Sequence, residues 1–236
     1  MYVLEAGDSM VSNICIFGDS VAKGVVLDQV QKKYTFLKDS FVRLISVKRG
    51  VQISNYSKFG CTVTKGLEMV RRHASELPKY DFIALEFGGN DCDYDWAQVA
   101  SAPLAEHACK TPVEAFEQSY CEMVHFVSEH GGRPVMLTLP PIDSQRYFNW
   151  ISRSLDGGNI LTFLGDVDHI YRWQEMYNRI VLRLAHMLGV PLIDIRSAFL
   201  QGGDYRDYLC EDGIHPNSRG HLLITDAIDR ALMRVS

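Results

Sequence analysis

The feature that most constrains the fold of this chain is a regular alternation of short apolar segments with longer amphipathic ones. The short segments have the length and composition of buried strands, and the longer ones carry apolar residues at helical spacing. We expect strands at residues 13–17, 51–56, 81–87, 133–139 and 190–195. We expect helices at residues 34–47, 64–75, 111–127, 168–188 and 217–235. This alternation predicts a three-layer α/β/α sandwich, in which a parallel sheet of about five strands is covered on both faces.

The length of the chain and two long connections bear on its organisation. With 236 residues and 47% hydrophobic content, the chain can build one substantial core. No stretch has the composition of a linker, so we expect residues 1–236 to form a single domain. The connections 91–110 and 141–167 are too long for plain turns, and both leave a predicted strand. We therefore expect both to overhang the carboxyl edge of the sheet.

Charge and cysteine content narrow the class of partner and the compartment. The formal net charge is −5 and the basic residues are scattered, whereas an extended phosphate backbone needs a basic stripe. We expect no nucleic-acid partner. Residues 1–8 lack the features of a signal peptide, and no apolar run approaches the length of a membrane span. The six cysteines show no paired CxxC spacing, which is typical of reduced thiols, so we expect a cytoplasmic protein. Nothing in the sequence indicates its oligomeric state.

The first predicted strand ends on Gly18-Asp19-Ser20. Gly18 permits a sharp change of direction, and residues that follow the strands of an open α/β sheet lie at the edge where such sheets bind ligands. Ser20 is therefore a candidate nucleophile, provided that a base, an orienting acid and an oxyanion hole lie nearby. Taken alone, a serine after a strand is more often a helix cap.

Three later stretches supply the missing groups. Gly60 follows the second predicted strand, Asn90 follows the third, and Asp212 and His215 precede the last helix. Histidine titrates near neutrality and can accept and return a proton, while an acid three residues earlier can hold its tautomer. Each residue has an ordinary alternative as a turn or surface residue. Their occurrence in order, each after the expected element, favours the catalytic interpretation.

The four stretches are similar to those of the SGNH hydrolases, also called the GDSL esterase/lipase family. The blocks of that family supply a Ser, a Gly, an Asn and an Asp-x-x-His pair in this order, and the resemblance extends from the first strand to the last helix. It implies a flavodoxin-like SGNH hydrolase fold and a serine esterase that works through an acyl-enzyme. It also implies a catalytic triad of Ser20, Asp212 and His215, with an oxyanion hole formed by the backbone N–H groups of Ser20 and Gly60 and the Asn90 side chain. No metal or organic cofactor is expected.

The sequence constrains the substrate less closely than the reaction. Members of the family act on acetylated sugars, lysophospholipids, thioesters and simple esters, so the fold does not decide between them. Aromatic and acidic residues in the long connections favour a small-molecule ester with a short acyl chain, such as an O-acetyl group on a carbohydrate. Alternatively, the aromatic residues only hold the connections against the body of the protein. The candidate substrate-binding residues are Asp19, Asp91, Tyr94, Trp96, Tyr147 and Trp150.

Other functions stay open beside this interpretation. A lysophospholipase or thioesterase could use the same catalytic residues with a longer acyl chain. An acyltransferase could use them if the loops exclude water from the acyl-enzyme. A binding module without turnover is disfavoured, because a pure binder has no need of the complete catalytic set.

Overall fold

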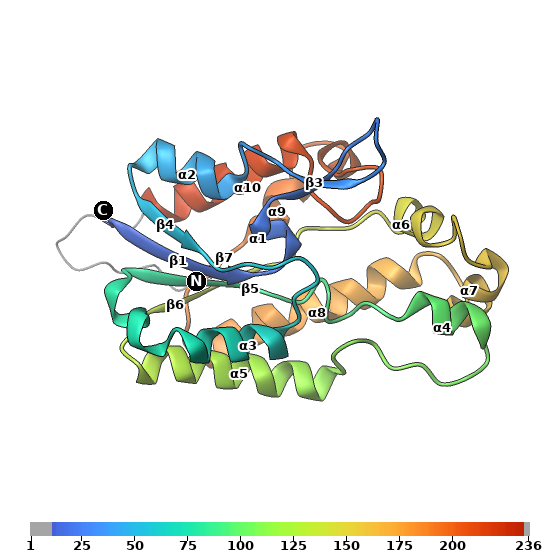
Figure 1. The fold of residues 1–236 in the computed structure, drawn as a ribbon, viewed down its shortest axis with the longest axis horizontal. Helices are drawn as coiled ribbons and strands as arrows, with labels where there is room; N and C mark the ends of the chain where they lie inside the picture. Colours follow the sequence, from blue (N-terminus) through green and yellow to red (C-terminus); the bar gives the residue numbers. More distant parts are fainter. Residues whose placement is uncertain (1–10, 234–236) are drawn as a thin grey trace.

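The computed structural model describes residues 11–233, and its centre is a five-stranded sheet (Figure 1). The strands are β1 (Asn13–Gly18), β4 (Gln52–Asn55), β5 (Phe82–Glu86), β6 (Pro134–Leu137) and β7 (Leu192–Ile193). All neighbouring pairs are parallel, and the spatial order is β4-β1-β5-β6-β7. Counted along the chain, these strands lie in the order 2-1-3-4-5, which is the flavodoxin-like order. The predicted α/β/α sandwich is confirmed.

Helices cover both faces of the sheet. One face carries α2 (Phe41–Arg49), α9 (Ile195–Leu200) and α10 (Ser218–Met233), and the other carries α3 (Val63–Arg72), α5 (Val113–Glu129) and α8 (His169–Met187). Successive side chains of β1 point to opposite layers, because side chains alternate along a strand. Ile14 and Ile16 pack with the first group of helices, whereas Cys15 and Phe17 pack with the second. Burial on both faces explains why the strands are continuous apolar runs.

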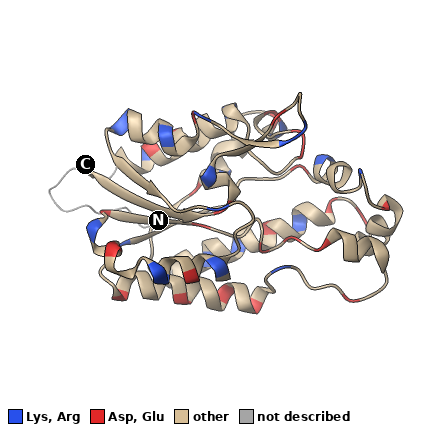
Figure 2. Cartoon of the chain, in the orientation of Figure 1, with Lys and Arg blue, Asp and Glu red and all other residues tan. Residues whose placement is uncertain are grey.

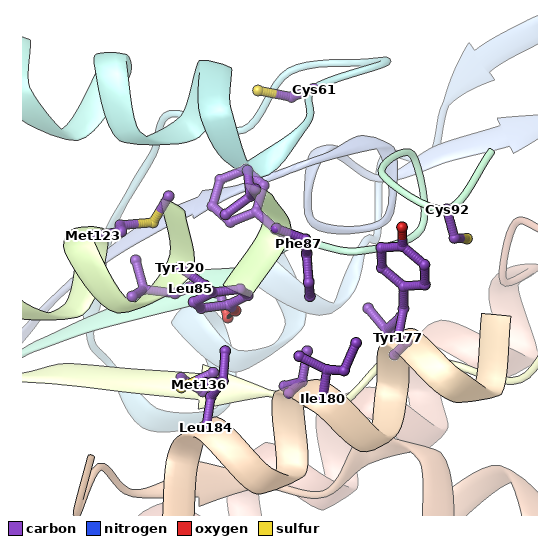
Figure 3. Packing of buried hydrophobic residues seen from close by; sticks show 14 of the residues in the cluster. Cys61, Leu85, Phe87, Cys92, Tyr120, Met123, Met136, Tyr177, Ile180 and Leu184 are labelled. Atoms are coloured by element: carbon purple, nitrogen blue, oxygen red, sulfur yellow. Dashed lines mark hydrogen bonds between the residues drawn. The ribbon is translucent and has the colours of Figure 1, made fainter. Parts of the chain in front are cut away.

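Large side chains fill the layer between the sheet and helices α3, α5 and α8. Figure 3 shows Tyr120 of α5 beside Leu85 of β5, with Tyr177 of α8 on the side of Phe87, the residue that follows this strand. The Tyr120 hydroxyl donates a hydrogen bond to the backbone carbonyl of Leu85 at 3.0 Å. A Cβ on Gly66 would lie 2.4 Å from the Phe87 ring, so α3 approaches the end of β5 as closely as a glycine allows. This packing fixes the end of β5, from which the Asn90 loop starts.

The helix predicted at residues 34–47 is wrong at its start. Tyr34–Phe36 forms strand β3, which pairs antiparallel with β2 (Val25–Leu27), and the helix begins only at Phe41. The apolar spacing of this stretch resembles a helical period, but a run of aromatic and β-branched residues favours a strand when a partner is available. The hairpin follows α1 (Ser20–Lys23) in the chain, and its strand β2 contacts that helix.

Two other predicted elements have different ends. The strand predicted at 190–195 is reduced to the two residues of β7, because Asp194 caps the N-terminus of α9 by accepting a backbone N–H of its first turn at 3.0 Å. The helix predicted at 64–75 ends at Arg72, and a 3₁₀ helix follows it. The remaining predicted strands and helices are observed within a few residues of their expected bounds, and positions 234–235 of the last predicted helix lie outside the described residues.

Both long connections contain helices that the sequence interpretation did not predict. The remaining elements are η1 (Ala74–Lys79), α4 (Trp96–Ser101), α6 (Ser144–Ile151), α7 (Gly157–Leu164) and η2 (Tyr205–Tyr208). Helix α4 packs against α7, and α6 packs against α7 and α8. Together α4, α6 and α7 extend beyond the carboxyl ends of the strands, at the right of Figure 1. The connections 91–110 and 141–167 therefore do overhang this edge of the sheet.

The charged residues are distributed over both helical layers. Figure 2 shows acidic and basic residues interspersed along the helices. Within residues 11–233, no helix combines the length and the apolar character that a membrane span requires. The expectation drawn from residues 1–8 concerns a part of the chain outside the described residues.

Candidate active site

The turn that follows β1 places Ser20 at the carboxyl edge of the sheet. Ser20 is the first residue of α1, and the Asp19 carboxylate caps this short helix by accepting the N–H of Val21 at 2.8 Å. A Cβ on Gly18 would lie only 3.0 Å from the carboxyl group of Glu86, so a glycine is needed where the turn passes β5. The Asp19 cap and the close approach of Gly18 to Glu86 together fix the turn that carries Ser20.

His215 connects the serine to an acid. Its Nε2 lies 3.0 Å from Ser20 Oγ, and its Nδ1 lies 2.7 Å from Asp212 Oδ2. The other carboxylate oxygen of Asp212 accepts the backbone N–H groups of Ile214 and His215, at 3.1 and 3.2 Å. An ionised carboxylate only accepts hydrogen bonds, so Nδ1 carries the proton and Nε2 is free to accept one from the serine.

The environment keeps Asp212 ionised. Ser20, His215 and Asp212 are all buried, with 7%, 3% and 0% of their surface exposed. Burial by itself raises the pKa of Asp212, but the hydrogen bonds from the His215 ring and from two backbone N–H groups outweigh it and hold that pKa below its usual value. The resulting negative charge stabilises an imidazolium on His215.

Gly60 and Asn90 lie on the wall of the same cavity as Ser20. Gly60 has φ 69°, a left-handed conformation that side chains disfavour. The Asn90 Nδ2 donates a hydrogen bond to Asp19 Oδ2 at 2.9 Å, which fixes the orientation of the amide. Three loops, after β1, β4 and β5, thus bring together the three residues that the sequence predicts for an oxyanion hole.

A cavity of about 290 Å³ opens beside Ser20 and His215. Its apolar wall includes Leu139, Pro140, Ile142, Ile151, Leu164, Ile170 and Trp173. All four aromatic residues among the predicted substrate-binding residues line it: Tyr94, Trp96, Tyr147 and Trp150. The Trp96 Nε1 and the Tyr147 hydroxyl both donate to Asp93 Oδ1, at 2.8 and 2.7 Å, so their polar atoms already have a partner. These two rings therefore contribute mainly apolar surface.

The other two predicted substrate-binding residues are buried acids. Asp19 lines the cavity, but its carboxylate is occupied by Val21 and Asn90. Asp91 is fully buried and accepts the backbone N–H of Val63 at 2.9 Å, at the N-terminus of α3. Burial raises the pKa of Asp91 to about 6. The structure places Asp91 beneath the site, away from the cavity wall.

Among the described residues, the site contains neither a cluster of metal ligands nor an activated thiol. No three His, Cys, Asp or Glu side chains of residues 11–233 are arranged to hold a metal ion. Cys61 and Cys92 directly follow the candidate oxyanion residues, and burial raises the pKa of Cys61 to about 11 and that of Cys92 well above its usual value. Both thiols therefore stay protonated and unreactive.

Comparison with known protein families identifies the family of this chain. The sequence matches the GDSL-like Lipase/Acylhydrolase family over residues 16–223, a range that contains all the candidate catalytic residues. The chain belongs to this family. As a member, it is a GDSL-type ester hydrolase. No curated protein matches the sequence.

Several solved hydrolase structures share the fold. A lipase/acylhydrolase from Enterococcus faecalis superimposes with a TM-score of 0.67 at 20% identity, covering 93% of this chain and 94% of that one. An acetyl xylan esterase from Geobacillus stearothermophilus gives 0.65 at 18% identity, covering 98% and 97%. An α/β hydrolase from the metagenome of Lake Arreo, Spain, gives 0.66 at 22% identity, covering 97% and 98%. At these identities the likeness shows the fold alone.

Three residues of this GDSL hydrolase were missed by the sequence interpretation. The rings of Tyr34 and Phe59 flank His215, with centroids 5.0 and 6.1 Å from the imidazole. Glu86 lies at the end of β5, is 1% exposed, and accepts two backbone N–H groups of the serine turn at 3.3 Å each. A single carboxyl residue in an otherwise apolar strand was the signal for Glu86. Tyr34 and Phe59 carry no such signal, because only the fold brings them to His215.

Proposed function

We propose that this GDSL hydrolase is a serine esterase that cleaves short-chain carboxylic esters through an acyl-enzyme. The observation that carries the proposal is the hydrogen-bonded series Ser20–His215–Asp212 at the wall of an apolar cavity. Ser20 Oγ attacks the acyl carbon while His215 Nε2 takes its proton. The imidazolium that forms is stabilised by the Asp212 carboxylate.

The remaining steps use the same groups. The tetrahedral intermediate carries a negative charge on the former carbonyl oxygen, and the backbone N–H groups of Ser20 and Gly60 and the Asn90 amide are the donors for it. His215 then protonates the leaving alkoxide as the acyl-enzyme forms. The neutral imidazole next takes a proton from water, which attacks the acyl carbon and releases the carboxylic acid and Ser20.

The cavity and its rim suit different halves of the ester. The apolar wall favours the acyl chain, because each buried methylene contributes about 0.8 kcal/mol. The rim carries the partly exposed rings of Tyr34 and Phe59, which suit the apolar face of a sugar. An acylated carbohydrate is therefore the alcohol half that we favour, in keeping with the acetyl xylan esterase among the structural neighbours.

The compartment is part of the same proposal. We place the enzyme in the cytoplasm. All six cysteines are free, including those buried in the core, and free thiols are typical of reducing compartments.

The test is hydrolysis of p-nitrophenyl acetate, butyrate and octanoate by the wild type and by Ser20→Ala. Two extra methylenes buried at about 0.8 kcal/mol each predict a kcat/KM for butyrate about 15-fold above that for acetate. We expect Ser20→Ala to lose at least ~1000-fold in kcat, and Ser128→Ala, an exposed serine on α5, to lose nothing. Equal rates in wild type and Ser20→Ala would exclude Ser20 as the nucleophile.

The same series separates the alternatives. A marked preference for octanoate would favour the lysophospholipase or thioesterase interpretation over a short-chain ester. A transfer product formed with an added alcohol or sugar would favour an acyltransferase. Release of acetate from an acetylated xylo-oligosaccharide, lost in Ser20→Ala, would support the carbohydrate half of the proposal.

A further inference from the structure

A second pair of acids lies directly under the serine turn. Glu86 and Asp19 are 1% and 2% exposed, and their carboxyl groups are in hydrogen-bond contact. Glu86 Oε2 accepts the backbone N–H groups of Asp19 and Ala22, both at 3.3 Å. In the sheet, Glu86 pairs with Gly18, and the absent side chain there leaves the space that the Glu86 carboxyl fills.

Two buried carboxyl groups in contact cannot both be ionised at neutral pH. Burial and the adjacent Asp19 charge raise the pKa of Glu86 well above its usual value, and burial also raises the pKa of Asp19. Glu86 is therefore the acid that retains a proton. Since Oε2 of Glu86 already accepts two N–H groups, its other oxygen carries the proton and donates it to Asp19.

Asp19 connects Glu86 to the candidate oxyanion hole through its hydrogen bond with Asn90. One of its oxygens accepts the Val21 N–H at 2.8 Å, and the other accepts the Asn90 Nδ2 at 2.9 Å. A carboxylate can only accept hydrogen bonds, so Asp19 binds the NH₂ group of the Asn90 amide. This prevents a flip of the amide that would turn its oxygen toward Asp19. One amide hydrogen of Asn90 is used by Asp19, and the second is left for the substrate oxygen.

We propose that Glu86 and Asp19 share one proton and act as positioning residues, with protonated Glu86 holding Asp19 and Asp19 holding the Asn90 amide toward the oxyanion. Neither acid takes part in bond making. The inference rests on the proposed function, because it gives the pair a role in the oxyanion hole.

The ionisable groups that face the pair come from several elements. They are Asp91 after β5, Cys61 after β4, Tyr120 on α5 and His215 before α10. At pH 8, Asp91 is ionised because its pKa is about 6, whereas the Cys61 thiol and the Tyr120 hydroxyl stay neutral because burial raises their pKa values. A carboxyl group that is still protonated at pH 8 therefore identifies the pair.

Infrared spectroscopy tests the shared proton directly. At pH 8 the wild type should show the carbonyl stretch of a protonated carboxyl group, which is separate from the carboxylate bands. Glu86→Gln should lose this band, whereas Asp39→Asn, which removes an exposed carboxylate, should keep it. Absence of the band from the wild type, or its survival in Glu86→Gln, would overturn the shared proton.

Kinetics test the positioning role. Glu86→Gln keeps a donor toward Asp19 and an acceptor for the two backbone N–H groups, whereas Glu86→Leu has similar size and neither. We expect kcat to fall roughly 10- to 100-fold in Glu86→Leu and no more than ~3-fold in Glu86→Gln, with little change in KM, because an oxyanion donor acts in the transition state. Equal losses in the two variants would overturn the role.

The two proposals fail in different ways. If Ser20→Ala retained turnover, the proposed catalytic mechanism would be wrong, but the infrared band would still report the proton between Asp19 and Glu86. If Glu86→Leu does not fold, Glu86→Gln and Asn90→Ala provide the test. Glu86→Gln keeps the hydrogen bonds of Glu86, so a loss of kcat in Glu86→Gln as large as that in Asn90→Ala would contradict the inference.

Discussion

Replacing Asp212 by asparagine should abolish most turnover, although it exchanges one oxygen for an NH₂ group. One oxygen of Asp212 accepts the backbone N–H groups of Ile214 and His215, at 3.1 and 3.2 Å, and the other accepts His215 Nδ1 at 2.7 Å. Asparagine has a single oxygen, and the two backbone donors hold it. Its NH₂ group then faces the imidazole and favours the tautomer that carries its proton on Nε2.

In that tautomer Nε2 is a donor and cannot take the proton of Ser20 Oγ, which lies 3.0 Å away. The corresponding change in a serine protease lowers kcat about 10⁴-fold, so we expect a loss of about 10³- to 10⁴-fold here. At about 1.36 kcal/mol per factor of ten, this is about 4 to 5.5 kcal/mol of transition-state stabilisation. KM should change little, because Asp212 is fully buried and does not line the cavity.

The measurement is kcat for p-nitrophenyl butyrate with wild type, Asp212→Asn and Asp207→Asn. Asp207 is an exposed carboxylate five residues earlier, and its replacement should leave kcat unaltered. Circular dichroism and urea unfolding establish whether the variants have the wild-type fold. A loss below ~10-fold in a folded Asp212→Asn protein would correspond to under about 1.4 kcal/mol and would refute the tautomer argument.

Three further predictions follow from backbone conformation and burial. Gly60→Ala should lower kcat on the butyrate ester at least ~10-fold, because a side chain at φ 69° strains the backbone by about 1–2 kcal/mol and turns the N–H from the oxyanion. Gly18→Ala should lower the free energy of unfolding in urea by about 1–3 kcal/mol, because the added Cβ would lie 3.0 Å from oxygens of Glu86. Burial of His221 lowers its pKa from 6.5 to about 4, so below pH 6.5 the unfolded chain binds a proton that the folded protein excludes. The contribution of His221 to the free energy of unfolding should therefore be complete above pH 6.5, and the free energy should fall by up to about 3 kcal/mol as the pH is lowered toward 4. The fall should be smaller in His221→Gln, which keeps an acceptor for the Phe41 N–H. Matching pH profiles would contradict the last prediction.

The sheet could be predicted from the sequence because its strands are buried on both faces and therefore appear as uninterrupted apolar runs. The hairpin of β2 and β3 could not be predicted. The apolar residues at 37, 41, 44 and 45 continue a helical period, and only the pairing of Tyr34–Phe36 with Val25–Leu27 shows where the helix starts. The short helices of the two long connections were also missed, since each depends on packing against its neighbours.

Ser20, Gly60 and Asn90 could be proposed from the sequence because each follows a strand that ends at the same edge of a parallel sheet, whereas Asp212 and His215 follow η2 and were proposed from their chemistry and their three-residue spacing. The position of Glu86 could not be predicted in this way. Its position beneath Ser20 follows from the register of β1 and β5, which pairs Glu86 with Gly18. The apolar strand marks Glu86 as an unusual acid, but no spacing along the chain reveals which residues of two strands will be opposite each other, so its place beside the serine turn comes only from the structure.

The contact between Ser20 and His215 joins residues 195 positions apart in the chain. Such a contact forms late, because the entropy of closing so long a loop must be met before the contact contributes anything. A chain in which β1 had paired with β4 and β5 before α10 docked would lack His215 beside Ser20, so we expect it to have no esterase activity. Recovery of esterase activity after dilution from denaturant should therefore lag behind recovery of secondary structure. Esterase activity would then measure the last step of folding.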